Sequence, residues 1–402
     1  MKDFERHAAG WRDPAQVASQ WQSAGDTDPS LLRSAVRGRW WETLAELKIT
    51  LIVTRETEHL IIALRCDEDG PDVSFVRIPH PSGLAVDRVR QVIFVASTRN
   101  PNQVFDFEPA CGQQDQADRG GPSAEGASLL PVRSRLFPGS LYMHDLSLIS
   151  GELHAAAVGQ NAIVRLGADA GYERVWWPRA IETTEGPVFH RNHLQLNSIA
   201  AGDVVDDSYF SASAERMSSR RPGHLNFPVD RRGVIFSGRT REPVVRGLTR
   251  PHSARLRDGR LWVDDSGYGT FGPCEDGLLT VATRLPGWTR GLCFVGTIAF
   301  VGTSHVIPRY RRYAPGLEPA SSECGVHAVN VRTGRVLGSI VWPGGNQIFG
   351  IDWIDSRTAV GLPFRTGRGT RKHERELFYS FATQRAGGRV DANSPKPRGG
   401  GP

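Results

Sequence analysis

Long hydrophobic runs are missing from this sequence. A membrane-spanning helix needs about eighteen consecutive apolar residues, and no stretch approaches this length. The N-terminal residues M-K-D-F-E-R-H are charged, whereas a secretory signal contains an apolar segment. These absences exclude a transmembrane helix and favour a protein that is not exported. We therefore expect a cytoplasmic location and no membrane partner.

Cysteine is also scarce, with five in 402 residues, an odd number that never occurs in C-x-x-C spacing. This excludes a disulfide framework and a cysteine-based metal knuckle, and it predicts reduced thiols. The motifs G-x-S-x-G, H-E-x-x-H, the Walker loop and the dinucleotide fingerprint are absent as well. Serine hydrolase, nucleotidase and simple dehydrogenase functions therefore lose their usual support.

The charge balance is basic, but it lacks the features of a nucleic-acid-binding protein. A formal net charge of +6 comes from an arginine excess that is spread along the chain and is densest at 309–312 and after Arg385. No pattern of interleaved aromatic residues and no nucleic-acid motif accompanies it. We therefore expect a solvated surface and no nucleic-acid partner.

Glycine and proline are abundant, with 44 and 26 residues, and this favours short strands joined by turns over long helices. The clearest unit is 250–267, R-P-H-S-A-R-L-R-D-G-R-L-W-V-D-D-S-G, in which Asp258-Gly259 forms the turn of a β-hairpin that begins at His252. The segment M-H-D-L-S-L-I-S-G-E-L-H has the same layout, and its His144 holds the place of His252.

The hairpin pattern occurs six times, at intervals of about 40 to 60 residues, which is the length of one four-stranded propeller blade. The units open at Ser82, His144, Asn197, His252, Arg290 and Phe349. We therefore predict an all-β fold, a six-bladed β-propeller.

The other segments are assigned around this ring. Residues 1–47 have apolar residues at helical spacing and are expected to form a helical N-terminal extension. Residues 48–384 form the propeller, in which 48–80 supply outer strands to the last blade and close the ring. Residues 214–232 should form a long loop, a candidate lid. Residues 385–402 have no means of burying apolar surface and should be a disordered tail.

The innermost strands of a propeller run along its axis, so the residues that open the six units should meet at one end of the central channel. Two of them are His144 and His252. His193, four residues before Asn197, and His305, at the far end of the fifth hairpin, add two imidazoles. Neutral imidazoles without thiolates suit iron(II), copper(II), zinc or nickel. We therefore predict a divalent transition metal, with iron(II) favoured, held by His144, His193 and His252, and His305 is a candidate for a fourth ligand although its place in the unit differs.

Three further residues are candidates for catalysis. Arg290 could clamp a carboxylate or phosphate of a substrate through its planar guanidinium. Asn197 opens the third unit, and Asp145, like Asp265, could accept a hydrogen bond from a histidine ring and fix its tautomer. The structural alternatives are a salt bridge between Arg290 and Asp145, and histidines that are simply packed in the blades.

The order of the motifs resembles that of a known family. The motifs are H-D-L, H-L-Q-L-N-S-I-A, R-P-H-S-A-R-L-R-D-G-R-L-W-V-D-D-S-G, W-T-R-G-L and C-G-V-H-A-V-N. They resemble a bacterial propeller family of conserved hypothetical proteins with a domain of unknown function. The resemblance implies a six-bladed ring, broadly like the gluconolactonase and strictosidine synthase propellers, with a site in the axial channel.

The resemblance also implies which residues lie in that channel. They are His144, His193 and His252, with Asn197 and Arg290 beside them. This chain departs from the family pattern: it has Asp265 where the family tends to asparagine, His305 where no histidine is usual, and Gln347 where a glutamate pair is usual. An added imidazole and a lost carboxylate suggest altered metal chemistry.

Two classes of function follow from these observations. The first is a metal-dependent enzyme that acts on a small polar or anionic metabolite in the channel. A non-haem iron-type oxidoreductase is favoured, because imidazole ligands leave open positions on redox-active iron, and a Lewis-acid lyase, epimerase or hydrolase is the alternative. The second class is a non-catalytic propeller that binds protein partners through its wide face and the segment 309–312.

Overall fold

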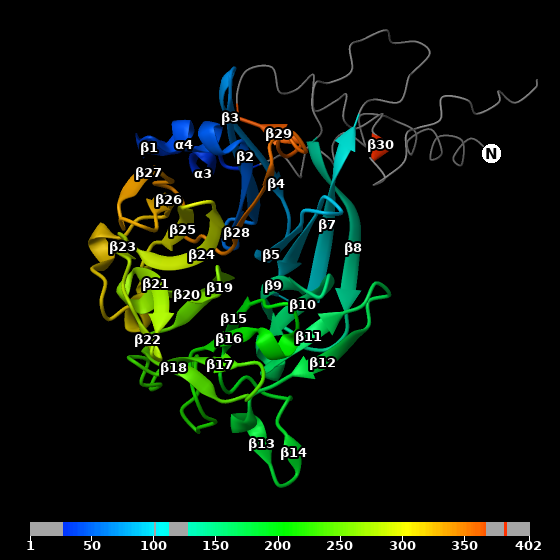
Figure 1. Ribbon diagram of the computed structural model, residues 1–402, viewed down its shortest axis with the longest axis vertical. Helices are drawn as coiled ribbons and strands as arrows, with labels where there is room; N and C mark the ends of the chain where they lie inside the picture. The colour runs from blue at the N-terminus through cyan, green and yellow to red at the C-terminus, as the bar shows by residue number, and fades with distance from the viewer. Residues whose placement is uncertain (1–26, 100–101, 112–127, 367–381, 384–402) are drawn as a thin grey trace, which may run out of the picture.

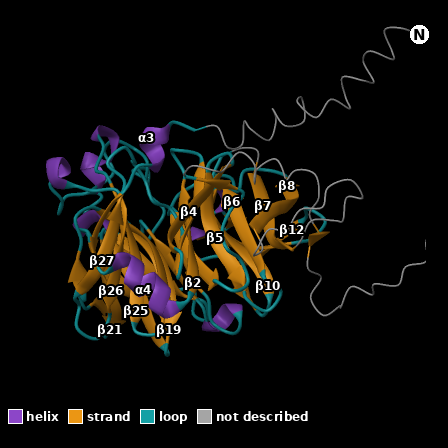
Figure 2. Ribbon diagram, turned by 90° about the horizontal axis from the view of Figure 1, so that it is seen from above, coloured by secondary structure: helices purple, strands orange, loops and turns teal. Residues whose placement is uncertain are grey.

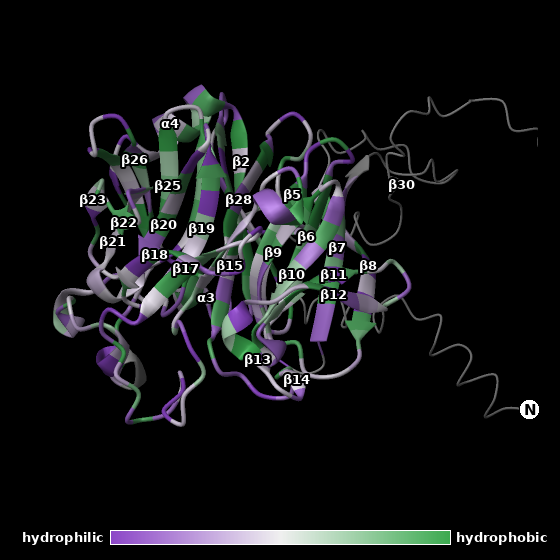
Figure 3. Cartoon of the chain, turned by 60° about the horizontal axis from the view of Figure 1, so that its bottom comes forward, coloured by the Kyte–Doolittle hydropathy of each residue, from purple (hydrophilic) through white to green (hydrophobic). Residues whose placement is uncertain are grey.

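The strands of the protein group into six sheets of four or five strands around one axis (Figure 1). The structure is a computed structural model that describes residues 27–99, 102–111, 128–366 and 382–383. Hydrophobic residues are concentrated along the strands, where they form the cores of the blades (Figure 3). The fold is therefore all-β, a six-bladed β-propeller, as the sequence predicts.

The first three blades follow one another along the chain, and each begins with its innermost strand. Blade one contains β5 (Pro81–Asp87), β6 (Val92–Ser97), β7 (Asn102–Cys111) and β8 (Ser128–Phe137), with β30 (Ala382–Thr383) beside β7. Blade two contains β9 (Met143–Ile149), β10 (Glu152–Ala157), β11 (Ala162–Leu166) and β12 (Tyr172–Trp176). Blade three contains β15 (Leu196–Ala200), β16 (Tyr209–Ala212), β17 (Gly233–Ser237) and β18 (Pro243–Leu248). A short hairpin of β13 (Glu182–Thr183) and β14 (Gly186–Pro187) projects between blades two and three.

The next two blades have the same order, with additions at their outer edges. Blade four contains β19 (Pro251–Arg257), β20 (Arg260–Asp265), β21 (Thr270–Glu275) and β22 (Leu278–Leu279), with β23 (Thr283–Arg284) beside β21. Blade five contains β24 (Trp288–Val295), β25 (Ile298–Ser304), β26 (Gly325–Asn330) and β27 (Val336–Val341).

The sixth blade joins the two ends of the chain. Its innermost strand is β28 (Ile351–Asp355), and its next strands come from the N-terminal part: β2 (Ile49–Arg55), β3 (Leu60–Asp67) and β4 (Gly70–Arg77), followed by β29 (Phe364–Arg365). Residues 48–80 thus supply the outer strands that the sequence analysis expects of them. Because β28 also contacts both β24 and β5, the ring is closed (Figure 2).

The N-terminal segment is only partly helical, which corrects the prediction for residues 1–47. α3 (Pro29–Leu32) and α4 (Trp40–Leu47) are helices, but β1 (Ala35–Gly38) is a strand that pairs with β27 as the fifth strand of blade five. The free edge of β27 offers backbone hydrogen bonds, which the spacing of apolar residues does not reveal. α4 then covers the blade, with the buried ring of Trp40 5.8 Å from that of Phe300.

Some predicted segments fall partly or wholly outside the described residues. They are 1–26 of the extension and the tail 385–402. The predicted loop 214–232 contains neither strand nor helix, and Phe227 and Val229 anchor it in the core. No helix in the described ranges has the length and apolar character needed to cross a membrane.

Small residues allow the innermost strands to approach one another closely. After the opening residue of a blade comes glycine or serine in all blades except the second, where Asp145 stands. A Cβ on Gly83 would lie 2.6 Å from the backbone of Asp145, so this position of blade one requires glycine. The axis is closely packed at this level, and the cavity described next lies on the side of the opening residues.

Candidate functional site

Five of the innermost strands carry a β-bulge at the residues that open their units. The register shifts lie in β5 between Pro81 and Leu84, in β9 between Met143 and Leu146, in β15 between Leu196 and Ser198, in β19 between His252 and Arg255, and in β24 between Thr289 and Leu292. A bulge redirects side chains away from the regular alternation of a strand. The opening residues can therefore face the axis while the rest of each strand packs into its blade.

A second repeated feature precedes these bulges. His80, Tyr142, Gln195 and Arg250 each lie two residues before an opening residue, and all four have positive φ, between 43° and 55°. This left-handed conformation is uncommon for residues other than glycine and occurs often at functional sites. It turns the chain sharply before each inner strand, at the same end of the ring.

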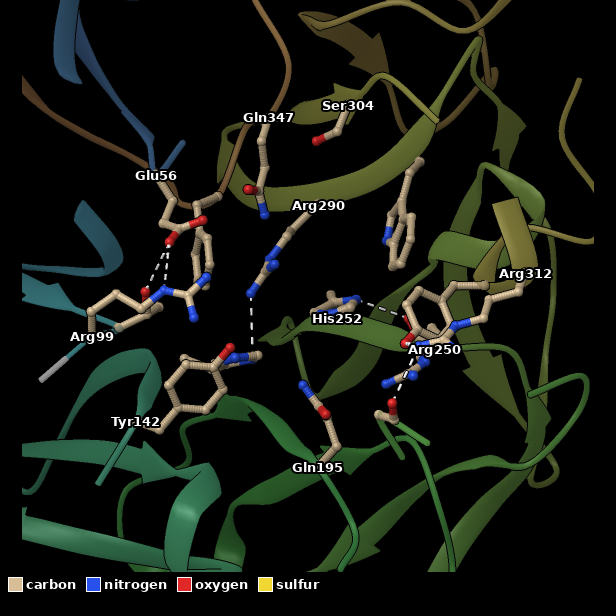
Figure 4. Close-up of a pocket in the computed structure, with 16 residues that line it drawn as sticks. Glu56, Arg99, Tyr142, Gln195, Arg250, His252, Arg290, Ser304, Arg312 and Gln347 are labelled. Atoms are coloured by element: carbon tan, nitrogen blue, oxygen red, sulfur yellow. Dashed lines mark hydrogen bonds and ion pairs between the residues drawn. The ribbon is translucent and has the colours of Figure 1, made fainter. Parts of the chain in front are cut away.

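A cavity of about 330 Å³ lies at this end (Figure 4). Among its lining residues, four are arginines and one is a carboxylate: Arg99, Arg250, Arg290, Arg312 and Glu56. Four aromatic residues complete much of the wall: Tyr142, Trp288, Tyr313 and Phe349. Aromatic walls with a few charged groups are typical of small-molecule sites, and the excess of arginine favours an anionic ligand.

Two of these arginines share one aromatic ring, and neither forms a salt bridge with a carboxylate in the part of the chain that the structure describes. The Cζ atoms of Arg250 and Arg312 lie 4.1 and 4.5 Å from the centroid of the Tyr313 ring. Nε of Arg250, and Nε and Nη1 of Arg312, are buried without a hydrogen-bond partner. Burial lowers the pKa of Arg250 to about 10, and the nearby charge of Arg312 acts in the same direction. The guanidinium of Arg250 therefore stays charged at neutral pH, and both side chains can donate hydrogen bonds to a bound anion.

His252 has a fixed tautomer. Its Nδ1 lies 2.9 Å from the carbonyl oxygen of Arg250 and 2.9 Å from Oγ of Ser266, whose own proton is donated to the carbonyl oxygen of Thr289. A carbonyl can only accept, so Nδ1 carries the proton. Burial, followed by the charge of Arg290, lowers the pKa of His252 well below 6.5. At neutral pH the ring is neutral and Nε2 holds the lone pair.

His144 has the opposite tautomer. Its Nδ1 faces Nη2 of Arg290 at 3.4 Å, and because a guanidinium can only donate, Nδ1 must accept and Nε2 carries the proton. Burial, followed by Arg290, lowers the pKa of His144 well below 6.5, while the interaction with Asn197 acts in the opposite direction. The rings of His144 and His252 are stacked with centroids 6.5 Å apart.

Arg290, predicted as a substrate clamp, is held from two sides. Its Cζ lies 3.2 Å from the centroid of the Phe349 ring. The amide of Gln347 accepts from Nη1 of Arg290 at 3.2 Å and donates to Oε2 of Glu56 at 3.0 Å. Glu56 also accepts from Nδ1 of His80 at 3.0 Å. The carboxylate is therefore tied to its own donors, with Gln347 between it and Arg290.

The other two predicted catalytic residues have partners in neighbouring blades, and Asn197 also interacts with His144. Asp145 pairs with Arg255 through distances of 2.7 and 3.1 Å and accepts from the backbone of Ile199. It does not line the cavity, so it neither orients a histidine nor pairs with Arg290, which corrects both expectations. Asn197 donates to the carbonyl oxygen of Pro251 at 2.8 Å and joins blades three and four.

Asp265 does not hold a histidine ring either. Its Oδ1 accepts from the backbone N–H of Thr249 at 2.6 Å, and burial raises its pKa to about 6. The backbone carbonyl of Arg250 takes the place that the sequence analysis gave to this carboxylate, next to His252.

The structure brings His144 and His252 together, but it does not place His193 or His305 with them. The backbone of His193 is held by Asn161, and its pKa is lowered by burial and by Arg221 and Arg191. The backbone N–H of His305 donates to the carbonyl oxygen of Asn346. In the described ranges, no group of three or more His, Cys, Asp or Glu side chains converges to hold a metal ion. The predicted four-histidine ligand set is therefore not assembled.

The repeat itself could have revealed several lining residues that the sequence analysis missed. Each of these lies two residues before an opening residue: Tyr142, Gln195, Arg250, Trp288 and Gln347. Reading the six units two positions earlier would have found them. Glu56 and Arg312 had no such signal, because they come from loops outside the repeated positions. Arg312 also turns into the cavity, although 309–312 was predicted as an outward basic patch.

The fold and this cavity define a six-bladed propeller with an arginine-rich axial pocket. The family described as "Domain of unknown function (DUF4915)" matches residues 38–360 of the chain. The protein therefore belongs to this family, in agreement with the resemblance seen in its motifs. No curated protein matches the chain by sequence.

Several solved structures are similar to the chain at low sequence identity. A nidogen/laminin complex has 10% identity and a TM-score of 0.47, covering 76% of this chain and 98% of that chain. A protein of unknown function from Bacteroides caccae has 10% identity and a TM-score of 0.45, covering 76% and 99%. A gluconolactonase from Xanthomonas campestris has 12% identity and a TM-score of 0.42, covering 74% and 86%. Similarities at this level carry no argument about activity.

Proposed function

We propose that the axial cavity binds a small anionic metabolite and that His252 acts on it as a general base. The observation that carries this proposal is the pair Arg250 and Arg312, whose buried guanidinium nitrogens lack partners beside the Nε2 lone pair of His252. Buried cations are normally paired or satisfied by a ligand. A carboxylate or phosphate would accept from both arginines and relieve the repulsion between them.

The reaction class follows from the tautomer of His252. With Nε2 free to accept, the imidazole can take a proton from the carbon next to a substrate carboxylate. The electron pair of the broken C–H bond moves into the carboxylate, where the guanidiniums stabilise the added charge. The bound anion also offsets the positive potential that lowers the pKa of His252 and so makes it a stronger base. This favours a lyase or isomerase.

A metal has no assigned step in this proposal. An iron(II) centre of the predicted kind needs three or four imidazoles in one coordination sphere, and His193 and His305 lie apart from the cavity lining. Iron(II) stays a prediction from the sequence, and it is tested by metal analysis of protein purified without an affinity tag. Under our proposal, treatment with EDTA followed by its complete removal by dialysis changes anion affinity by less than about twofold.

Calorimetric titration with inorganic phosphate, acetate and citrate tests the binding step. We expect at least one of these anions to bind, and Arg312→Gln to weaken that binding about tenfold or more, because a charged hydrogen bond is lost. The neighbouring, exposed Arg311 supplies a matched control, and Arg311→Gln should bind like the wild type. Absence of anion binding, or equal loss in both variants, contradicts the proposal.

Exchange of hydrogen for deuterium tests the chemical step. In D2O, a bound carboxylate with an acidic C–H should lose the NMR signal of that hydrogen when the protein is present. His252→Gln should slow the exchange about a hundredfold or more, which is the usual contribution of a general base. Anion affinity should remain within a few-fold of the wild type, and an equal exchange rate in both proteins excludes His252 as the base.

A further inference from the structure

A second hollow, of about 530 Å³, lies next to the axial cavity. The two share Tyr142, which lines both. They also share the loop 214–232, which contributes Gly223 to the axial cavity and Arg221 to the second hollow. One side chain and one loop thus form the boundary between the two spaces.

The second hollow is also basic. Among the described residues, its lining contains His190, Arg191 and Arg221 and no carboxylate. Arg221 is positioned by Nε2 of His224, which accepts from its Nε at 3.0 Å, and by the carbonyl oxygen of Asn192, which accepts from Nη1 at 3.1 Å. These contacts orient the guanidinium but leave its charge without a counter-charge from the lining.

The neighbouring groups support an anion site at this place. The pKa of His193 is lowered by burial first, and then by the charges of Arg221, Arg191 and His190. Several elements therefore direct positive charge to one point of the surface. Phe189 forms an apolar part of the wall and is itself covered by Arg174, whose Cζ lies 4.4 Å from the ring centroid.

We propose that the two hollows are one binding site for an elongated ligand with an anionic group at each end. One group lies at Arg250 and Arg312, the connecting chain passes Tyr142, and the second group lies at Arg221 and Arg191. The inference rests on the proposed function, because it takes the axial cavity as the site of the first anion. It adds a substrate class: a dicarboxylate, or a carboxylate that also carries a phosphate, rather than a compact mono-anion.

A series of straight-chain dicarboxylates of increasing length measures whether the two sites act together. Each diacid is compared with the monocarboxylate of equal chain length by calorimetric titration of the full-length protein. Short diacids should bind like their monocarboxylates. Beyond a threshold length, the diacid should bind at least about tenfold more tightly, because its second carboxylate reaches Arg221.

The variant Arg221→Gln should abolish this gain for long diacids and leave the monocarboxylates unchanged. Arg220→Gln is the matched control, since Arg220 is exposed and is not part of either lining. Because both residues lie in a loop without strand or helix, both variants should fold, and their thermal unfolding checks this directly.

The outcomes separate the two proposals. If monocarboxylates bind and depend on Arg312 but diacids of every length gain nothing, the axial site stands and the second site is wrong. A diacid gain that survives Arg221→Gln also overturns the second site. If no carboxylate or phosphate binds at all, the proposed function itself fails.

Discussion

Arginine side chains have different surroundings in two layers of the propeller axis. One layer is the closely packed level of the innermost strands, and the other is the level of the cavity. In the packed layer, Arg255 is paired with Asp145 through two hydrogen bonds, and the pair connects blades two and four. At the cavity, Arg250 and Arg312 stack on Tyr313, and some of their nitrogens have no partner. The side chains are the same and all are at least half-buried, but the counter-charge is present in one layer and missing in the other.

The difference indicates what each layer is for. A buried ion pair with its hydrogen bonds satisfied is a structural connection, which is sensitive to the loss of either partner. Buried guanidiniums without a counter-charge lower the stability of the empty protein, and a ligand that supplies the missing charge can recover this free energy on binding. The layers should therefore respond oppositely to the removal of charge.

Asp145→Ala should have the largest effect. It leaves Arg255 buried without its carboxylate, and we expect the free energy of unfolding to fall by about 3 to 5 kcal/mol. Chemical denaturation measures this. The double variant Asp145→Ala with Arg255→Met removes both charges and should be more stable than the single variant. A double variant that is less stable would show that the charge pair is not the cause.

Asp264→Asn should stabilise the protein. Neither oxygen of this fully buried carboxylate has a partner in good hydrogen-bond geometry, and burial raises its pKa well above 3.8 although Ser253 and Arg255 act in the opposite direction. A raised folded-state pKa means that the stability present below about pH 3.8 is lost as the pH rises. We expect Asp264→Asn to gain about 1 to 3 kcal/mol at pH 7 and less at pH 5, measured by denaturation at both values. An equal gain at both contradicts the ionisation argument.

The two axial histidines should make stability depend on pH in the opposite direction. Their folded-state pKa values lie well below 6.5, so below about pH 6.5 the unfolded chain binds protons that the folded protein does not. The free energy of unfolding then falls as the pH falls toward the folded-state values. His252→Gln should reduce this slope by up to about 1.4 kcal/mol per pH unit between pH 6.5 and 5. A slope that is the same in His252→Gln and in the wild type would contradict this account.

Arg250→Met should have the smallest effect on stability. It therefore gives the clearest contrast with the loss of the Asp145–Arg255 pair. Its charge has no carboxylate partner, so we expect the free energy of unfolding to remain within about 1 kcal/mol of the wild type. Phosphate or carboxylate affinity should still fall about tenfold or more. If the loss of stability instead matches that of Asp145→Ala, Arg250 is a structural residue and the contrast between the layers disappears.

The architecture could be predicted from the sequence because most strands of a blade are consecutive in the chain. Hairpins with a repeated turn pattern, spaced by the length of a blade, predict six sheets and the residues that open them. The strand Ala35–Gly38 was not predictable in this way, because it forms by pairing with β27, about 300 residues later in the chain. The pairing of the two chain ends in blade six followed from the absence of a unit for 48–80.

The site was predictable only where it follows the repeat. His144, His252 and Arg290 were found because they hold equivalent positions, and Arg250 holds another such position two residues earlier. Arg312 lies between two strands, outside the repeated positions. No periodicity of the sequence predicts where its side chain points. A related reason applies to His193 and His305: His193 was placed by its proximity in sequence to Asn197 and His305 by its position at the far end of the fifth hairpin, and neither position fixes the direction of a side chain.

The assembly of blade six from both ends of the chain has a consequence for folding during synthesis. Its innermost strand, β28, is synthesised more than two hundred residues after β2 to β4. These three strands therefore have no inner neighbour during most of synthesis. Such distant pairing is slow, and it comes last. The cavity includes Glu56, which follows β2, and Phe349, which lies close before β28. It therefore cannot be complete on a nascent chain that lacks β28. Ligand affinity should appear abruptly on completion of the ring, and a chain that stops before β28 should have none of it.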